Sequence, residues 1–211
     1  MTETQKMLAR ADRHLSASCP HMKDLVRRVG PCGLQTQPDG FQMLVRSITA
    51  QQISGAAARS IGRRLRNRLP SAEVTPEAVR SLGGAAMRSC GYSARKASYI
   101  LGLADAVLDG GLDLAAMRHL PDKEVIARLT VVRGIGVWTA KMFLIFSLGR
   151  PDVLPHEDLG VRQALRNFHG LSELPGRPES IRLARPWRPY ASVASWYCWR
   201  SLDPQFAAGD Q

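Results

Sequence analysis

The feature that most constrains the fold is a short turn enclosed by two apolar segments, RGIGVWTA at residues 133–140. The segments on both sides place apolar side chains at helical spacing. Gly134 and Gly136 allow backbone angles and close approaches that a side chain would prevent, and Ile135 can point into the core. The pattern predicts two helices joined by a tight hairpin; taken alone, it also fits an ordinary helix–helix turn.

Strand signals are sparse, because no Val/Ile/Thr-rich alternating runs are joined by Asn-Gly or Asp-Gly turns. Helical patterns that stop at glycine or proline are frequent instead. A proline-rich connection separates the last two of them. The predicted helices are 5–15, 41–52, 56–69, 76–84, 93–111, 121–129, 137–148, 157–168 and 188–202. The sequence therefore predicts an all-α protein.

The charge of the chain suggests a polyanionic partner. Lys and Arg number 29 against 18 Asp and Glu, for a net charge of +11, and a basic surface gains affinity by releasing counterions from phosphates. Host composition is the alternative explanation for this excess. The N-terminus lacks the apolar core of a signal peptide, and no apolar run reaches membrane-spanning length. We therefore expect a cytosolic protein without a membrane partner.

The four cysteines are scattered, with no C-x-x-C pair. A zinc or iron–sulfur site needs clustered ligands. In a cytosolic protein, reduced thiols in the core are the simpler interpretation.

An acidic pair follows the hairpin. Asp158 lies 20 residues beyond Trp138, directly after Pro155-His156-Glu157, at the predicted start of a helix. A helix N-terminus favours a carboxylate there, so a simple N-cap is one interpretation of Asp158. A dinucleotide-binding loop is excluded, because Thr139 stands where a third small residue is needed and the preceding segment is helical.

The stretch LTVVRGIGVWTAKMFLIFSLGRPDVLPHEDLGVRQAL resembles the helix–hairpin–helix DNA glycosylases of the AlkA-like 3-methyladenine DNA glycosylase II branch. The resemblance extends to VRSITAQQIS, SCGYSARKASYILGLADAV and PWRPYASVASWYCW and spans roughly residues 41–203. It implies two helical lobes with the active site in the cleft between them, one of residues 22–150 and one of 1–21 plus 151–211. Because only about forty residues precede the first matching helix, we expect a compact form without the large N-terminal β-domain of some relatives.

The resemblance implies a monofunctional DNA glycosylase that hydrolyses the N-glycosidic bond of alkylated, cationic bases, typically 3-methyladenine, in base excision repair. Asp158 falls on the catalytic aspartate of the family. Relatives that also cut the DNA strand carry a lysine where this chain has Trp138, so no AP lyase activity is expected. The alternatives are a glycosylase for ethenoadenine, hypoxanthine or 1-methyladenine, and a non-catalytic module that binds damaged DNA.

The resemblance also implies a pocket for the extruded base. Indole rings attract a cationic base through their faces, although core packing is the alternative for each tryptophan. Trp187 and Trp199 are assigned to the core, and His156 to a structural or solvated role. The residues matched to the pocket are Trp138, Trp196, Met142 and Leu159.

Contacts to double-stranded DNA follow from the same resemblance. Gln52 or Ser54 is expected to enter the duplex from the family's wedge loop, unless the segment is an interhelical turn capped by Ser54. The amides of Gly134 and Gly136 would hold a phosphate. Further phosphate contacts are expected from Lys141 and from Arg59, Arg63 and Arg66. For the three arginines, solvated side chains without a partner in DNA are the alternative.

No cofactor is required by this interpretation, and the family's iron–sulfur cluster should be absent because only Cys198 lies near the C-terminus. As in the family's hairpin, the carbonyls of Thr130, Val132 and Ile135 would hold a structural Na⁺ or K⁺. We expect a monomer, associated with the nucleoid if the source is bacterial.

Overall fold

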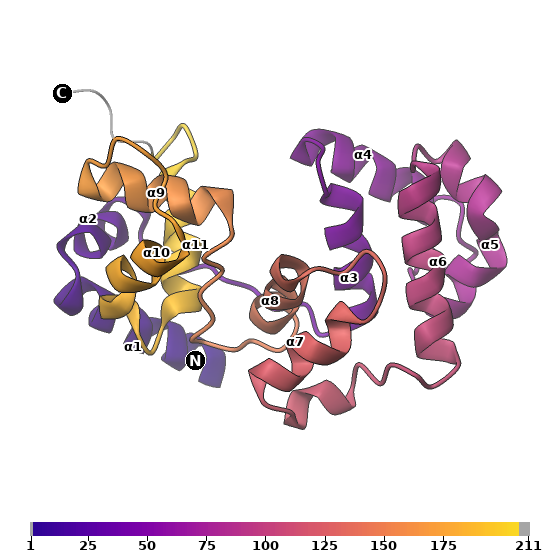
Figure 1. The fold of residues 1–211 in the computed structure, drawn as a ribbon, viewed down its shortest axis with the longest axis horizontal. Helices are drawn as coiled ribbons and strands as arrows, with labels where there is room; N and C mark the ends of the chain where they lie inside the picture. Colours follow the sequence, from indigo (N-terminus) through magenta and orange to yellow (C-terminus); the bar gives the residue numbers. More distant parts are fainter. Residues whose placement is uncertain (1, 207–211) are drawn as a thin grey trace. The chain divides into compact units, whose positions relative to one another are not determined.

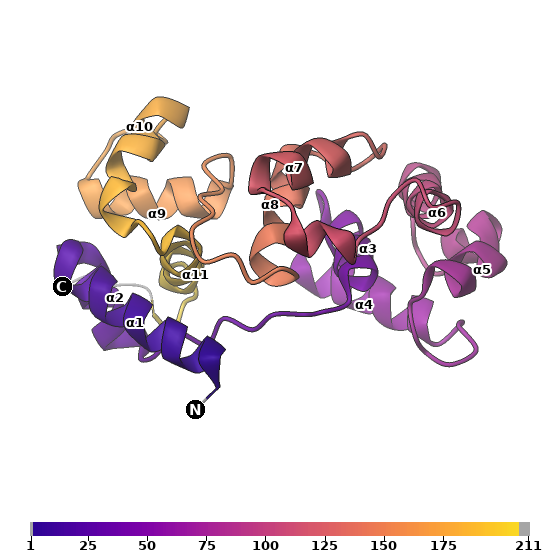
Figure 2. The same ribbon diagram turned by 90° about the horizontal axis from the view of Figure 1, so that it is seen from below.

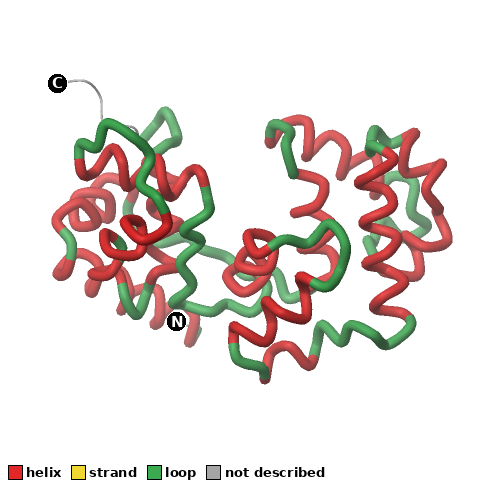
Figure 3. Tube along the Cα trace, in the orientation of Figure 1, coloured by secondary structure: helices red, strands yellow, loops and turns green. Residues whose placement is uncertain are grey.

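The computed structural model describes residues 2–206, in which every regular element is an α-helix or a short 3₁₀-helix (Figure 3). No strand occurs within that range, so the predicted all-α class is confirmed. None of the helices in the described part of the chain is both long and apolar enough to cross a membrane. The described residues form two compact units, one of 2–36 with 149–206 and one of 37–148.

The first unit combines helices from both ends of the chain (Figure 2). Its elements are α1 (Glu3–Ser18), α2 (Pro20–Val29), α9 (Leu159–His169), α10 (Arg177–Leu183), η2 (Arg185–Trp187) and α11 (Ala191–Ser201). α11 packs against α1, α2 and α9. Tyr197 of α11 is fully buried, and its hydroxyl donates a hydrogen bond to Asp12 Oδ1 of α1 at 2.8 Å. Trp187 is 1% exposed, which confirms its assignment to the core.

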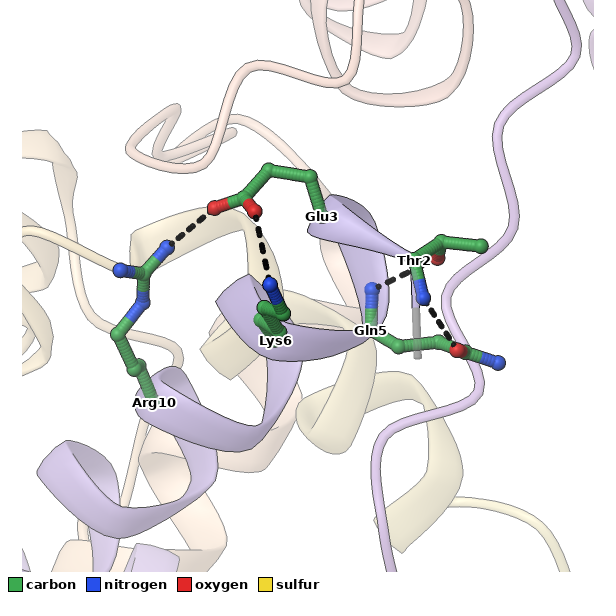
Figure 4. A network of polar contacts seen from close by, with 5 residues as sticks. All are labelled: Thr2, Glu3, Gln5, Lys6 and Arg10. Carbon is green, nitrogen blue, oxygen red and sulfur yellow. Dashed lines mark hydrogen bonds and ion pairs between the residues drawn. The ribbon is translucent and has the colours of Figure 1, made fainter.

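The start of α1 shows how local sequence sets a helix boundary (Figure 4). The Thr2 hydroxyl accepts from the Gln5 amide, and the Gln5 side chain accepts from the Thr2 amide, which is a capping box. Glu3 forms exposed ion pairs with Lys6 and Arg10, and such pairs contribute little to stability.

The second unit contains the remaining helices (Figure 1). They are α3 (Gly40–Ala50), α4 (Gly55–Arg66), α5 (Pro76–Ser89), α6 (Ala94–Leu108), η1 (Ala116–His119), α7 (Asp122–Thr130) and α8 (Val137–Phe146). α5 and α6 lie side by side, and α3 contacts α4, α6 and α8. Leu44, Ile48, Ile100 and Phe143 form part of a core that is at most 1% exposed.

The first boundary between the units differs from the prediction. It falls after Thr36 rather than after His21, because α2 belongs with the C-terminal helices. Met22 and Leu25 of α2 are completely buried, and α2 packs on α1 and α11. The second boundary follows Leu148 instead of Arg150. Residues 207–211, assigned to the second predicted lobe, lie outside the described residues.

Three helical segments also depart from the predicted pattern. α2 was not anticipated, and α10 occupies part of the proline-rich connection. α5 was expected to end at Gly83-Gly84 but bends at Gly83, whose φ is +73°, and continues to Ser89. Gly84 lies against Leu101 of α6 and Met87 is fully buried, so packing offsets the local effect of the two glycines on this second half of α5.

Candidate functional site

The hairpin between α7 and α8 uses its two glycines differently. Gly134 has a φ of +94°, and a Cβ placed there would lie 2.3 Å from Cδ2 of Tyr99. Gly136 has a negative φ, and a Cβ there would meet no atom within 4 Å. Ile135 is 4% exposed and points into the core as predicted, and its amide donates to the Val132 carbonyl at 3.0 Å. Only Gly134 is therefore required by the shape of the turn.

Gly136 is the N-cap of α8, and no side chain caps this end of the helix. Gly136 is exposed, and Val137 is 44% exposed. Amide groups at an uncapped helix N-terminus are suited to hold an anion. The N-terminus of α8 therefore lies at the surface, and the phosphate contact of the Gly134 and Gly136 amides stays a prediction.

Two arginines beside the hairpin were not singled out from the sequence. The guanidinium carbons of Arg95 and Arg133 lie 5.5 and 5.9 Å from the centroid of the Tyr99 ring. The hydrogen bond from Arg95 Nε and the positive charge of Arg133 lower the pKa of the Tyr99 hydroxyl. Both arginines are exposed, so they add positive charge next to Gly134. Their one local signal is the position of Arg133 directly before the Gly-Ile-Gly turn.

The loop between α3 and α4 presents Gln52 to solvent. Gln52 is exposed and has a φ of +57°, a region in which residues other than glycine are uncommon. The Ser54 hydroxyl accepts from the Ala57 amide and caps α4, as in the alternative interpretation of this segment. Of the two predicted wedge residues, Gln52 is thus the one whose side chain is not used as a cap.

The predicted phosphate-binding cations differ in exposure. Arg59, Arg63 and Arg66 are exposed on α4, in agreement with a basic face. Lys141 is only 9% exposed, so it does not present the free surface ammonium that the predicted phosphate contact assumed. α8 is apolar on nearly all sides, and Lys141 is buried with its neighbours on that helix.

Asp158 is the N-cap of α9, and its position is fixed by two N–H donors. Its Oδ1 atom accepts from the Val161 amide at 2.9 Å and from Nε1 of Trp199 at 2.9 Å. The side chain is half-buried. The N-cap interpretation of Asp158 is therefore correct, and it leaves a carboxylate with a defined orientation at the start of a helix.

α11 holds the segment that leads to Asp158. The Ser192 hydroxyl donates to the Arg150 carbonyl at 2.7 Å and accepts from the Val153 amide at 2.9 Å. The Ser192 amide donates to the Pro151 carbonyl at 3.0 Å. Both the approach to Asp158 and the carboxylate itself are thus attached to one helix.

Trp199 has a different role from the predicted one. It was assigned to the core, but it is half-buried and its indole N–H contacts the Asp158 carboxylate. It also packs on Gly160, where a Cβ would lie 2.9 Å from Cδ1 of Trp199. The sequence carried no signal for this contact, because 41 residues separate Trp199 from Asp158.

The residues matched to the base pocket belong to both units. Trp138 and Met142 lie one turn apart on α8; Trp138 is half-buried and Met142 is buried. Leu159 is 60% exposed. Trp196 is half-buried on α11, and the guanidinium carbon of Arg200 lies 5.5 Å from its ring centroid. The pocket formed by these side chains stays a prediction.

His156 lies beside an acidic side chain, and the cysteines lie in the core. His156 Nδ1 lies 3.6 Å from Glu157 Oε2. All four cysteines are buried and free, as expected. Burial, and to a lesser extent the negative charge of Asp158, raise the pKa of the Cys198 thiol well above its ordinary value. Within residues 2–206, no group of three or more His, Cys, Asp and Glu side chains is placed to hold a metal ion.

The hairpin combines an uncapped helix N-terminus with two exposed arginines, a combination that suits binding to a nucleic-acid backbone. The Asp158 carboxylate adds a group with a fixed orientation that can take part in a reaction. The chain belongs to the HhH-GPD superfamily of base excision DNA repair proteins, whose family model matches residues 45–189.

Named relatives agree with this assignment. The chain is 34% identical over 199 residues to DNA-3-methyladenine glycosylase 1 of Schizosaccharomyces pombe, covering 92% of this chain and 87% of that protein. A solved structure of the S. pombe 3-methyladenine DNA glycosylase with abasic DNA matches with a TM-score of 0.86 and 32% identity, over 94% of this chain and 100% of that one. A DNA-3-methyladenine glycosidase from Bacillus halodurans matches with a TM-score of 0.73 and 35% identity, over 87% and 89% of the two chains.

The hairpin glycines provide a matched pair of stability tests. Gly134→Ala should lower the free energy of unfolding by about 2–4 kcal/mol, because the new methyl group meets Tyr99 at an unfavourable φ. Gly136→Ala should change it by less than about 1 kcal/mol. Urea unfolding measures both, and equal losses would show that the Gly134 turn is not under this steric constraint.

The contact between Asp158 and Trp199 can be measured by a double-mutant cycle. Trp199→Phe keeps an aromatic ring but removes the donor, and should cost about 1–2 kcal/mol in unfolding free energy. In an Asp158→Ala background the same change should cost less, by about 1 kcal/mol. Additive losses in thermal or urea unfolding would mean that the two side chains are not coupled.

Proposed function

We propose that this chain is a monofunctional DNA glycosylase that removes alkylated bases, typically 3-methyladenine, from double-stranded DNA in base excision repair. The observation that carries the proposal is the Asp158 carboxylate, held by the Val161 amide and the Trp199 indole N–H. The relatives named above as 3-methyladenine glycosylases support the choice of substrate. The same proposal includes a monomeric enzyme in the cytoplasm, associated with the nucleoid if the source is bacterial.

The proposed reaction begins with extrusion of the damaged base. Removing a base from the stack costs a few kcal/mol, and less when the base is damaged. Gln52, exposed in its loop, would occupy the gap. The amides of Gly134 and Gly136 would hold a backbone phosphate during this step. Arg95 and Arg133 would add attraction that does not depend on sequence.

The extruded base is proposed to stack on the indoles of Trp138 and Trp196. A base alkylated on a ring nitrogen is cationic, and an indole face attracts it by roughly 0.5–2 kcal/mol beyond ordinary stacking. A neutral base gains less from the same contact. The charge of the lesion, rather than a set of hydrogen bonds, would therefore provide the selectivity.

Asp158 is proposed to act on the sugar. As the N-glycosidic bond lengthens, positive charge develops on the deoxyribose, and a fixed carboxylate nearby stabilises it. The carboxylate also orients or deprotonates the water that attacks C1′. The bonding electrons stay with the base, so a cationic base departs as a neutral molecule and needs little acid assistance. Trp138 offers no amine for a Schiff base, so the DNA strand is not cut.

A structural Na⁺ or K⁺ in the hairpin belongs to the same proposal. Carbonyl oxygens suit hard cations. The Val132 carbonyl accepts one hydrogen bond, from the Ile135 amide, and retains a second lone pair. The Thr130 hydroxyl donates toward the Ile126 and Ala127 carbonyls, so Thr130 would contribute its carbonyl. No further cofactor and no iron–sulfur cluster is invoked.

The proposed role of Asp158 is tested by Asp158→Asn, which separates catalysis from capping. Asparagine is an equally good N-cap and can accept the same two N–H donors. The variant should fold and bind duplexes with an abasic-site analogue nearly as well as the parent. Release of 3-methyladenine should fall by at least 10²–10³-fold, on the order of the effect of removing one preorganised electrostatic contact.

The matched control is Glu157→Gln, which removes the neighbouring negative charge and should retain most of the activity. Excision by Asp158→Asn at the parental rate would rule out the proposed mechanism. A parent protein that binds damaged DNA but releases no base would instead be the non-catalytic module. If the parent released ethenoadenine, hypoxanthine or 1-methyladenine faster than 3-methyladenine, that other lesion would be the preferred substrate.

A further inference from the structure

Lys96 fastens the end of α3. Its ammonium donates to the carbonyls of Thr49 at 2.8 Å and of Gln51 at 2.7 Å. The last carbonyls of a helix have no partner within the helix, and a cation there is favoured by the helix dipole. Lys96 is half-buried on α6, and burial lowers the pKa of its ammonium. The Lys96 ammonium is therefore stabilised by hydrogen bonds to two backbone carbonyl oxygens.

Gln51 connects the same point to the hairpin. While its carbonyl accepts from Lys96, its side-chain Nε2 donates to the Gly134 carbonyl at 3.0 Å. Gly134 in turn packs on Tyr99, which lies one turn after Lys96 on α6. Residues three apart lie on the same side of a helix. One face of α6 thus supports both the loop after α3 and the turn of the hairpin.

Gln52 follows directly in the chain and adopts a left-handed backbone conformation while exposed to solvent. Such a conformation persists when its surroundings hold it. The neighbouring contacts are those of Gln51, one residue earlier, and the hydrogen bond from the Ile53 amide to the Ala50 carbonyl at 3.4 Å, one residue later. The contacts of Gln51 with Lys96 and Gly134 therefore help to set the direction in which the Gln52 side chain points.

We propose that Lys96 and Gln51 are positioning residues that brace the Gln52 loop against the Gly134 hairpin, so that Gln52 enters the duplex at a fixed offset from the phosphate held by the hairpin. The inference rests on the proposed glycosylase function. It assigns the two residues to base extrusion and not to the cleavage of the glycosidic bond. Weakening the brace should lower the fraction of bound DNA in which the base is extruded, with little effect on binding to the backbone.

The test compares Lys96→Met and Gln51→Leu with the parent in single-turnover excision of 3-methyladenine at saturating enzyme. Each change removes a donor and keeps much of the side-chain volume. Each should lower the excision rate by about 10- to 100-fold, the effect of losing a charge-assisted or buried hydrogen bond. The affinity for an abasic-site duplex should change by less than about threefold, because the phosphate contacts remain. Lys123→Met, which removes an exposed lysine of α7, is the control and should match the parent.

A second substrate separates extrusion from general damage to the fold. When the lesion lies opposite an abasic site, extrusion is easier, so the loss caused by either variant should shrink to a few-fold. Equal losses on both substrates, or no loss on either, would overturn the brace. A parent protein that excises nothing would contradict the proposed function instead. If Lys96→Met does not fold, Gln51→Leu decides the outcome, since it leaves the Lys96 contacts in place.

Discussion

The proposed reaction depends on the two N–H donors that converge on one oxygen of Asp158. The Val161 amide belongs to the helix that Asp158 begins, and the indole of Trp199 comes from α11. A carboxylate that acts on a developing charge must be oriented before the reaction, since reorientation would consume the stabilisation it supplies. The N-cap and the catalytic interpretations of Asp158 are therefore compatible. The contact that stabilises the helix also fixes the carboxylate.

In the unit of residues 37–148, one helix likewise supports two parts of the proposed DNA-binding surface. α6 supports the Gly134 turn through the Tyr99 ring and the Gln52 loop through the Lys96 ammonium. A phosphate contact and a wedge act together only if the distance between them is maintained, because a misplacement of about 1 Å can reduce a rate by about 100-fold. A helix is stiff enough to maintain this distance, whereas a loop alone is not.

The sequence predicted the features that are encoded locally. The all-α class, the hairpin around Ile135 and the helix that begins at Asp158 follow from periodicity, glycine spacing and capping residues. Contacts that depend on helix packing were missed. Trp199 reaches Asp158 across 41 residues, and Lys96 reaches Gln51 across 45. The continuation of α5 through Gly83 likewise results from packing on α6, which a local pattern does not contain.

The most direct test is a crystal structure of the protein with duplex DNA that carries a stable analogue of 3-methyladenine. The proposed mechanism predicts an extruded analogue stacked on the indoles of Trp138 and Trp196. It also predicts a carboxylate oxygen of Asp158 about 3–4 Å from C1′ of that nucleotide, within reach of the reacting atoms. A base that stays stacked in the duplex while the protein is bound, or an Asp158 carboxylate more than about 8 Å from C1′, well outside reacting distance, would contradict the central claim.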